Sequence, residues 1–132
     1  MKVVLDTNIF ISALTLPGGQ AEKAVLGAVE GRFELAISKP IMHEVLGVLA
    51  RKFARDAEEI ARVAVFLTEL GEVVHPRKTL NVLRDEPDNR ILECALTAHA
   101  KAIVTGDRAM LALGEYKGVR LVTLREFLGL IG

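Results

Sequence analysis

The sequence has a single cysteine and no excess of charge of either sign. Because Cys94 stands alone, an internal disulfide and a thiolate metal site are both excluded. The 17 basic and 17 acidic residues cancel, and the pI is near 6.8. A protein that coats nucleic acid by neutralising phosphates over its whole surface needs net positive charge, so this class is disfavoured. A nuclease with locally placed basic groups is still permitted.

Long apolar runs are also missing, although 51% of the residues are hydrophobic and the mean hydropathy is +0.33. No run approaches the ~18 residues that cross a membrane, and no basic segment followed by an apolar one begins the chain. We therefore expect no membrane partner, no export signal and a cytoplasmic location. The apolar surplus favours a self-association face, which a monomer in light scattering would contradict.

Short apolar runs alternate with segments of helical periodicity along the whole sequence. Strands are predicted at 3–5, 33–37, 73–74, 101–105 and 119–123. Helices are predicted at 9–14, 20–30, 39–53, 57–70, 88–99, 109–113 and 124–131. This alternation implies parallel strands joined by right-handed crossovers. We predict one domain over residues 1–132, an α/β/α sandwich with a central parallel sheet of five strands.

Polar residues mark the helix starts and one long loop. Asn8, Ser38 and Asp56 each precede a periodic apolar segment and are predicted N-caps. Residues 75–87 are polar and bounded by prolines, which predicts a loop of unusual length. Loops of that length commonly carry function.

Four acidic residues are predicted to approach the same edge of the sheet. Asp6 follows the first strand, Asp107 follows the fourth, and Asp88 opens a helix that enters from that rim. Open α/β sheets bind ligands at the carboxyl ends of their strands. Glu44 lies within a helix, on a face that it shares with apolar neighbours.

Each of these acids also has a purely structural interpretation. Asp88 and Asp107 are residue types that cap helices, a role worth about 1 kcal/mol, and Glu44 alone is an ordinary helix-flank residue. Asp6 is harder to explain, because a carboxylate that ends a buried strand is costly to desolvate. Two carboxylates about 5 Å apart repel by about 3 kcal/mol at an effective dielectric of about 20.

A divalent cation would remove this repulsion. Carboxylate oxygens suit Mg²⁺ or Mn²⁺, and these ions activate water for attack on a phosphodiester. The acids, without a His or Cys ligand set, therefore predict a metal-dependent nuclease.

Four segments of the sequence resemble PIN-domain proteins, including those described as toxins of bacterial and archaeal toxin–antitoxin pairs. The segments read LDTNIFISAL at 5–14, SKPIMHEVLGVL at 38–49, DEPDNRILECAL at 85–96 and IVTGDRAML at 103–111. They occur in the family's order and span nearly the whole chain. The resemblance implies a Mg²⁺- or Mn²⁺-dependent endoribonuclease with an RNA substrate, an antitoxin partner, a parallel five-stranded sheet and a dimeric state.

The resemblance also implies roles for individual residues. The catalytic and metal-binding acids would be Asp6, Glu44, Asp88 and Asp107, with Asn8 and Thr105 supporting the carboxylates. Many relatives carry a further acid where this sequence has Ala109, so the choice between one metal ion and two stays open. The second-choice acids nearby are Asp85, Glu86 and Glu93.

Several basic residues lie near these acids in the sequence. RNA phosphates would be contacted by Arg84, Arg90, Arg108 and Lys39. The alternative is that these are ordinary solvated side chains.

Two other classes of function fit parts of the sequence. A receiver-like signalling domain shares the expected architecture, but it needs a phosphorylatable Asp after the third strand, and none follows Val74. A PIN-like protein that binds RNA or a partner without cleaving it is compatible with Ala109 and the neutral charge. The histidines do not accompany a Ser or Cys nucleophile motif, and Cys94 is predicted to be an inert core thiol.

Overall fold

The computed structural model describes residues 1–132 as one six-stranded sheet with seven helices. The strands are β1 (Lys2–Leu5), β2 (Glu34–Ser38), β3 (Glu72–Val74), β4 (Ala102–Val104), β5 (Glu115–Tyr116) and β6 (Val119–Val122). The helices are α1 (Thr7–Thr15), α2 (Gln20–Val29), α3 (Lys39–Lys52), α4 (Ala57–Leu70), α5 (Glu86–Ala98), α6 (Arg108–Ala112) and α7 (Leu124–Ile131). None of these helices combines the length and the apolar character that crossing a membrane requires.

The sheet has the order β3-β2-β1-β4-β6-β5. The five neighbouring strands β3, β2, β1, β4 and β6 pair in parallel, which confirms the five predicted strands. The two-residue β5 was not predicted, and it pairs antiparallel with β6. The two strands are joined by Lys117 and Gly118, both with positive φ, which is the backbone of a type I′ hairpin turn.

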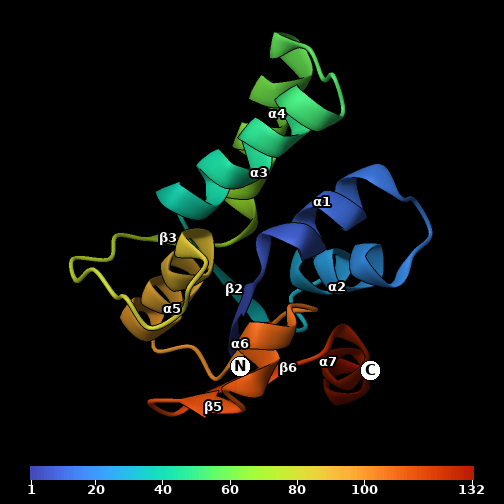
Figure 1. Ribbon diagram of the computed structural model, residues 1–132. Coiled ribbons are helices and arrows are strands. Elements are labelled where there is room, and N and C mark those ends of the chain that lie inside the picture. Colours follow the sequence, from blue (N-terminus) through green and yellow to red (C-terminus); the bar gives the residue numbers. More distant parts are fainter.

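Helices cover both faces of the sheet, as Figure 1 shows with α5 on one side and α1, α2 and α7 on the other. The helix α5 packs across β1 to β4, and α2 packs against α7. An edge-to-face contact between Phe33 and Phe127, with ring centroids 4.9 Å apart, lies among the buried residues of this second layer. The α3–α4 pair extends away from the sheet as an arm (Figure 1).

One hydrophobic cluster of 34 buried residues joins all the layers. The central strands β1 and β4 are buried along almost their whole length, as expected for parallel strands covered on both faces. This shared core connects the sheet to the helices on both of its faces; the single domain over residues 1–132 stays a prediction.

The helix starts agree with the sequence at some positions and differ at others. Ser38 and Asp56 are N-caps, as predicted, and accept hydrogen bonds from the amides of Ile41 and Glu59. The prediction for Asn8 is wrong: Asp6 occupies the N-cap position of α1, because its extended backbone lets its carbonyl accept from the amide of Ile9.

The start of α5 also differs. The helix begins two residues before the predicted start, so Asp88 lies inside the first turn and does not cap it. The N-cap position belongs to Asp85, followed by Pro87 in the first turn, where proline needs no amide hydrogen bond.

Gly71 connects α4 to β3 where the backbones approach closely. A Cβ atom at this position would lie within 2.4 Å of the Leu35 carbonyl oxygen on β2. The contact therefore excludes any larger side chain unless the backbone moves.

Candidate active site

Asp6 and Thr105 join the carboxyl ends of the two central strands. The Asp6 carboxylate is 5% exposed and Thr105 is fully buried. The Thr105 hydroxyl donates to Asp6 Oδ2 at 2.6 Å, and the Asp6 amide donates to the Val104 carbonyl at 2.9 Å. The same hydroxyl accepts from the Asp107 amide at 3.0 Å. Thr105 thus fixes the positions of Asp6 and of the loop that carries Asp107.

Burial raises the pKa of Asp6 above its ordinary value of 3.8. The Thr105 hydroxyl and the backbone amides of Asn8 and Thr7 lower this pKa, whereas the Asp107 charge raises it. Burial outweighs the hydrogen bonds, so the ionised carboxylate is destabilised in the fold.

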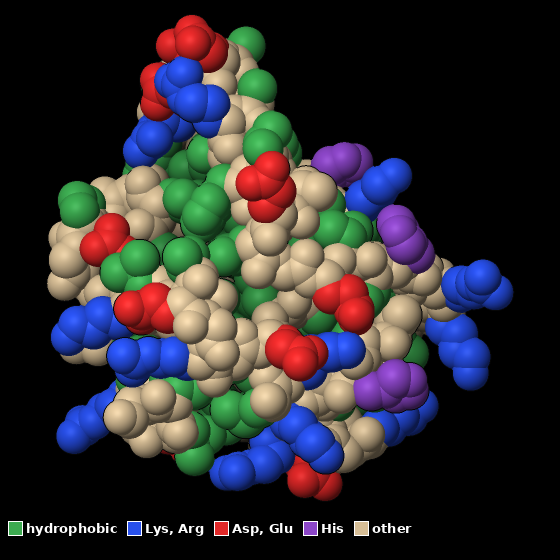
Figure 2. Space-filling view, turned by 180° about the vertical axis from the view of Figure 1, so that it is seen from behind, with side chains coloured by type: hydrophobic (Ala, Val, Ile, Leu, Met, Phe, Trp, Pro, Cys, Tyr) green, Lys and Arg blue, Asp and Glu red, His purple; other side chains and the backbone are tan.

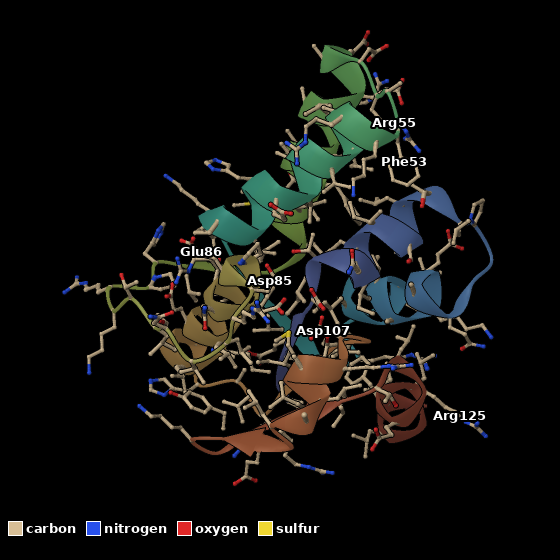
Figure 3. The ribbon with its side chains drawn as sticks, in the orientation of Figure 1. Phe53, Arg55, Asp85, Glu86, Asp107 and Arg125 are labelled. Carbon is tan, nitrogen blue, oxygen red and sulfur yellow. The ribbon has the colours of Figure 1, made fainter.

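Asp107 is a half-buried N-cap of α6, as predicted for this residue type. Its Oδ1 accepts from the Met110 amide at 2.9 Å. Figure 3 shows Asp107 at the end of the sheet where α5 begins with Asp85 and Glu86. The Asp107 side chain therefore both caps α6 and lies close enough to the other acids to affect their pKa values.

Asp88 is the acid most strongly affected by its surroundings. It is 7% exposed, and its Oδ2 is buried without a hydrogen-bond partner. Burial, and then the charges of Asp107, Asp6 and Asp85, raise the pKa of Asp88 to about 7. The structure thus brings Asp6, Asp88 and Asp107 into one electrostatic group, with Asp85 near it.

Glu44 lies beside this group without being part of it. The half-buried side chain lines a cavity of about 270 Å³ with Thr7 from α1 and with Glu86, Pro87 and Arg90 from α5. Its charge is not among those that raise the pKa of Asp6 or Asp88. No three His, Cys, Asp or Glu side chains lie close enough, as they stand, to hold a metal ion together.

The two predicted supporting residues differ in their contacts. Thr105 makes the hydrogen bonds described above, whereas Asn8 is exposed on α1 and its side chain forms no hydrogen bond. Asn8 acts on Asp6 through its backbone amide, which lowers the pKa of that carboxyl.

The second-choice acid Glu93 is not part of the acidic group, and its charge is not among those that raise the pKa of Asp6 or Asp88. It is 8% exposed, accepts from the Leu80 amide at 2.7 Å and pairs with Arg90 at 2.8 Å. Arg90 also donates to the Leu80 carbonyl and to Glu86. The charge of Arg90 is thus neutralised within the protein. The other predicted RNA-contacting residues are exposed and form no ion pair; they are Arg84, Arg108 and Lys39.

Asn89, which the sequence analysis missed, holds the β3–α5 loop against α5. Its Oδ1 accepts from the amides of Val82 and Leu83 at 3.0 and 2.8 Å, and its amide group donates to the Leu83 carbonyl at 2.8 Å. A polar residue on the buried side of a predicted helix is the only signal that could have indicated it. This contact fixes the loop next to Asp88.

Cys94 is fully buried in α5. Burial raises the pKa of its thiol to about 12, which confirms the prediction of an inert core thiol.

Comparison with known proteins gives one matching family and one curated relative. A family model described as "PIN domain" matches residues 2–109. An uncharacterized protein of Methanocaldococcus jannaschii, MJ1680, is 32% identical over 119 residues, which cover 87% of this chain and 76% of that protein.

Solved structures share the fold at low sequence identity. A chain of VapBC2 from Rickettsia felis, bound to a DNA fragment from its promoter, superimposes with a TM-score of 0.63 at 17% identity, covering 93% of this chain and 98% of that one. A chain of VapBC-1 from nontypeable Haemophilus influenzae gives 0.61 at 18% identity, covering 95% and 99%.

Proposed function

Because this chain belongs to the PIN-domain family, we propose that it is a metal-dependent endoribonuclease that hydrolyses RNA phosphodiester bonds. The observation that carries the proposal is the group of Asp6, Asp88 and Asp107, in which burial, and after it the charges of the neighbouring acids, raises the pKa of Asp6 and Asp88. Membership of the PIN-domain family excludes the alternative of a receiver-like signalling domain. Repelling carboxylates at the ligand-binding edge of a parallel sheet are better suited to holding a cation than to stabilising the fold.

The residues present fit Mg²⁺ or Mn²⁺. All the donors are carboxylate oxygens, and Asp88 Oδ2 is a buried acceptor without a donor. Asp6, Asp88 and Asp107 would hold the ion, and Glu44 would complete the set from the adjacent cavity. These side chains must move closer together to do so. The bound cation would supply charge stabilisation at the phosphodiester and a more acidic water.

The side chains around the acids would divide the remaining work. Thr105 orients Asp6 through its 2.6 Å hydrogen bond, and Asn8 supports the same carboxyl through its backbone amide. Asp88 or Glu44 would orient the attacking water and accept its proton. RNA phosphates would contact Arg84, Arg108 and Lys39.

We further propose that this ribonuclease is the toxin of a toxin–antitoxin pair, acts in the cytoplasm and is a homodimer. Support for an antitoxin partner comes from the VapBC fold relatives, two of which superimpose over more than nine-tenths of this chain. A small reading frame directly beside this gene, encoding a protein that binds the chain, would support the pairing.

A catalytically weak module that only binds RNA or a protein partner is the second candidate. It is favoured by Ala109, which stands where many relatives carry a further acid, and by the absence of three acids within ligand distance of one point. Calorimetric titration with Mn²⁺ together with cleavage of a mixed RNA pool separates the two candidates. Metal binding without cleavage would favour the binding module.

The decisive experiment for the nuclease is Asp6→Asn. Removing the charge while keeping the shape should abolish metal-dependent cleavage and leave the circular dichroism spectrum unchanged. Asp56→Asn is the matched control, since Asp56 is an N-cap on the distant α3–α4 arm and Asn caps about as well as Asp. It should cleave at the wild-type rate. Cleavage retained by purified Asp6→Asn would refute the assignment.

A further inference from the structure

A basic recess of about 470 Å³ lies apart from the acidic group, against the opposite end of α5. It is formed where the β3–α5 loop, the last turns of α5 and the β5–β6 turn meet. The polar and charged side chains that line the basic recess are His75, Arg77, Lys78, Glu93, Thr97 and Lys117.

The charge of the basic recess is strongly positive. Arg77, Lys78 and Lys117 form no ion pair. The one acid in the lining, Glu93, is already neutralised by Arg90 at 2.8 Å. The local excess contrasts with the zero net charge of the whole chain. It therefore marks a site for an anionic partner and is not a general property of the surface.

Two contacts hold the cationic segments in place before any ligand binds. The loop that carries Arg77 and Lys78 is anchored where the Leu80 amide meets Glu93 at 2.7 Å. Lys117 sits in the type I′ turn with its Nζ 5.5 Å from the centre of the Tyr116 ring. Charges held on a fixed frame lose less conformational entropy when an anion binds.

The distance between the recess and the acids suits a short stretch of stacked nucleic-acid strand. Thr97 lies nine positions after Asp88 on α5, which corresponds to about 13 Å along the helix axis at 1.5 Å per residue. At about 3.4 Å per nucleotide of stacked strand, this spans roughly four nucleotides. In Figure 2, Lys, Arg and His side chains gather along the edge that Figure 1, seen from the other side, assigns to the β3–α5 loop and the β5–β6 hairpin.

We propose that the basic recess binds the phosphate backbone of the single-stranded RNA substrate, roughly four nucleotides from the bond that is cleaved. The inference rests on the proposed ribonuclease function. Thr97 adds a hydroxyl group beside the three cations. The recess would supply affinity and register for the strand, since phosphate contacts position a nucleic acid without reading its sequence.

The test compares two triple variants with the same change in charge. Arg77→Ala/Lys78→Ala/Lys117→Ala removes the cations of the recess. Arg51→Ala/Lys52→Ala/Arg125→Ala removes three exposed cations from α3 and α7; Figure 3 shows Arg125 on α7, far from the β3–α5 loop. Fluorescence anisotropy with a labelled 12-nucleotide RNA of mixed sequence, in EDTA, gives the affinity at several salt concentrations without cleavage.

For the recess variant we expect the slope of log affinity against log salt to become shallower by about 2, because each phosphate contact to a single strand contributes about 0.7. The control variant should keep the wild-type slope. The proposal would be overturned if the recess variant and wild type had equal slopes, or if both variants lost RNA affinity equally. It would also be overturned if the recess variant lost affinity only for duplex DNA of the same length, or if wild-type protein bound no RNA.

A cleavage assay separates this proposal from the one on which it rests. A trinucleotide is too short to reach the recess from the acids, so the recess variant should cleave it like the wild type while its KM for the 12-nucleotide RNA rises. Wild-type protein that never cleaves but shows the predicted slope change refutes the nuclease alone. Normal metal-dependent cleavage with an unchanged slope refutes the recess alone.

Discussion

Replacing Asp88 with Asn should make the protein more stable at alkaline pH and leave it unchanged in acid. The pKa of Asp88 rises from 3.8 to about 7 on folding, chiefly through burial. Below pH 3.8 both states hold the proton. Between pH 3.8 and about 7 the unfolded chain loses it while the folded protein retains it, so the free energy of unfolding falls as pH rises. Above about pH 7 the folded protein has also lost the proton, and the free energy of unfolding falls no further.

The size of the effect follows from the same two pKa values. Each pKa unit corresponds to about 1.4 kcal/mol, so a rise from 3.8 to about 7 gives an upper limit of about 4 kcal/mol. Solvent near the rim and relaxation of the carboxylates reduce this, and we expect about 2 kcal/mol. Asn has nearly the shape of Asp and carries no charge, so it removes the buried carboxylate without opening a cavity.

The assay is urea unfolding at pH 4.5, 6 and 8 with EDTA present to exclude metal ions. Asp88→Asn should exceed wild type by a smaller amount at pH 4.5, just above the pKa of the unfolded chain, than at pH 8, where the excess should reach about 2 kcal/mol. Glu69→Gln, an exposed acid on α4, is the control and should change stability by less than about 0.5 kcal/mol at every pH. Parallel stability curves for Asp88→Asn and wild type would refute the reasoning.

Three further predictions concern contacts around the site and the frame that holds it. Thr105→Val, which removes the 2.6 Å donor to Asp6, should lower the free energy of unfolding by about 1–3 kcal/mol in urea titrations at pH 8, whereas Thr105→Ser should recover most of the loss; equal loss in both variants would contradict the role of the hydroxyl. Arg90→Ala removes the hydrogen bond to the Leu80 carbonyl and the ion pairs with Glu86 and Glu93. Amide hydrogen exchange in residues 77–85 should therefore become faster relative to exchange in the sheet. Unchanged exchange in these residues would show that Arg90 does not hold the β3–α5 loop in place. Gly71→Ala should destabilise the protein by more than about 1 kcal/mol, because the new Cβ atom would meet the Leu35 carbonyl oxygen. Gly129→Ala, with open space around it in α7, should stabilise the protein by about 0.5–1 kcal/mol. Thermal unfolding measures both changes, and equal effects of the two substitutions would exclude the clash at Gly71.

The sequence predicted the order of strands and helices because the apolar periodicity of this chain changes sharply at its Gly, Pro and Asp positions. It also predicted that Asp6 and Asp107 share an edge, since both follow parallel strands. It misplaced the cap of α1, because Asp6 and Asn8 are equally good capping residues and only the backbone decides between them. The two-residue β5 is too short to give any periodic signal.

The contacts of the long loop were beyond sequence reasoning for a different reason. Asn89 and Glu93 bind backbone amides 6 to 13 residues away, and their residue types do not specify such partners. The position of Glu44 has a similar origin. Helical spacing indicated its face, but its distance from the other acids depends on how α3 leaves the sheet, which is set by tertiary packing.

The two edges of the sheet have a consequence for how copies of this protein can associate. One edge is β3 with three residues and the other is β5 with two. A foreign strand laid along either would gain only a few backbone hydrogen bonds, so neither edge offers a template for growth into a fibre or a continuous intermolecular sheet. The proposed homodimer therefore gains little from either edge of the sheet, whereas α4 offers the large exposed apolar side chains of Val65 and Phe66.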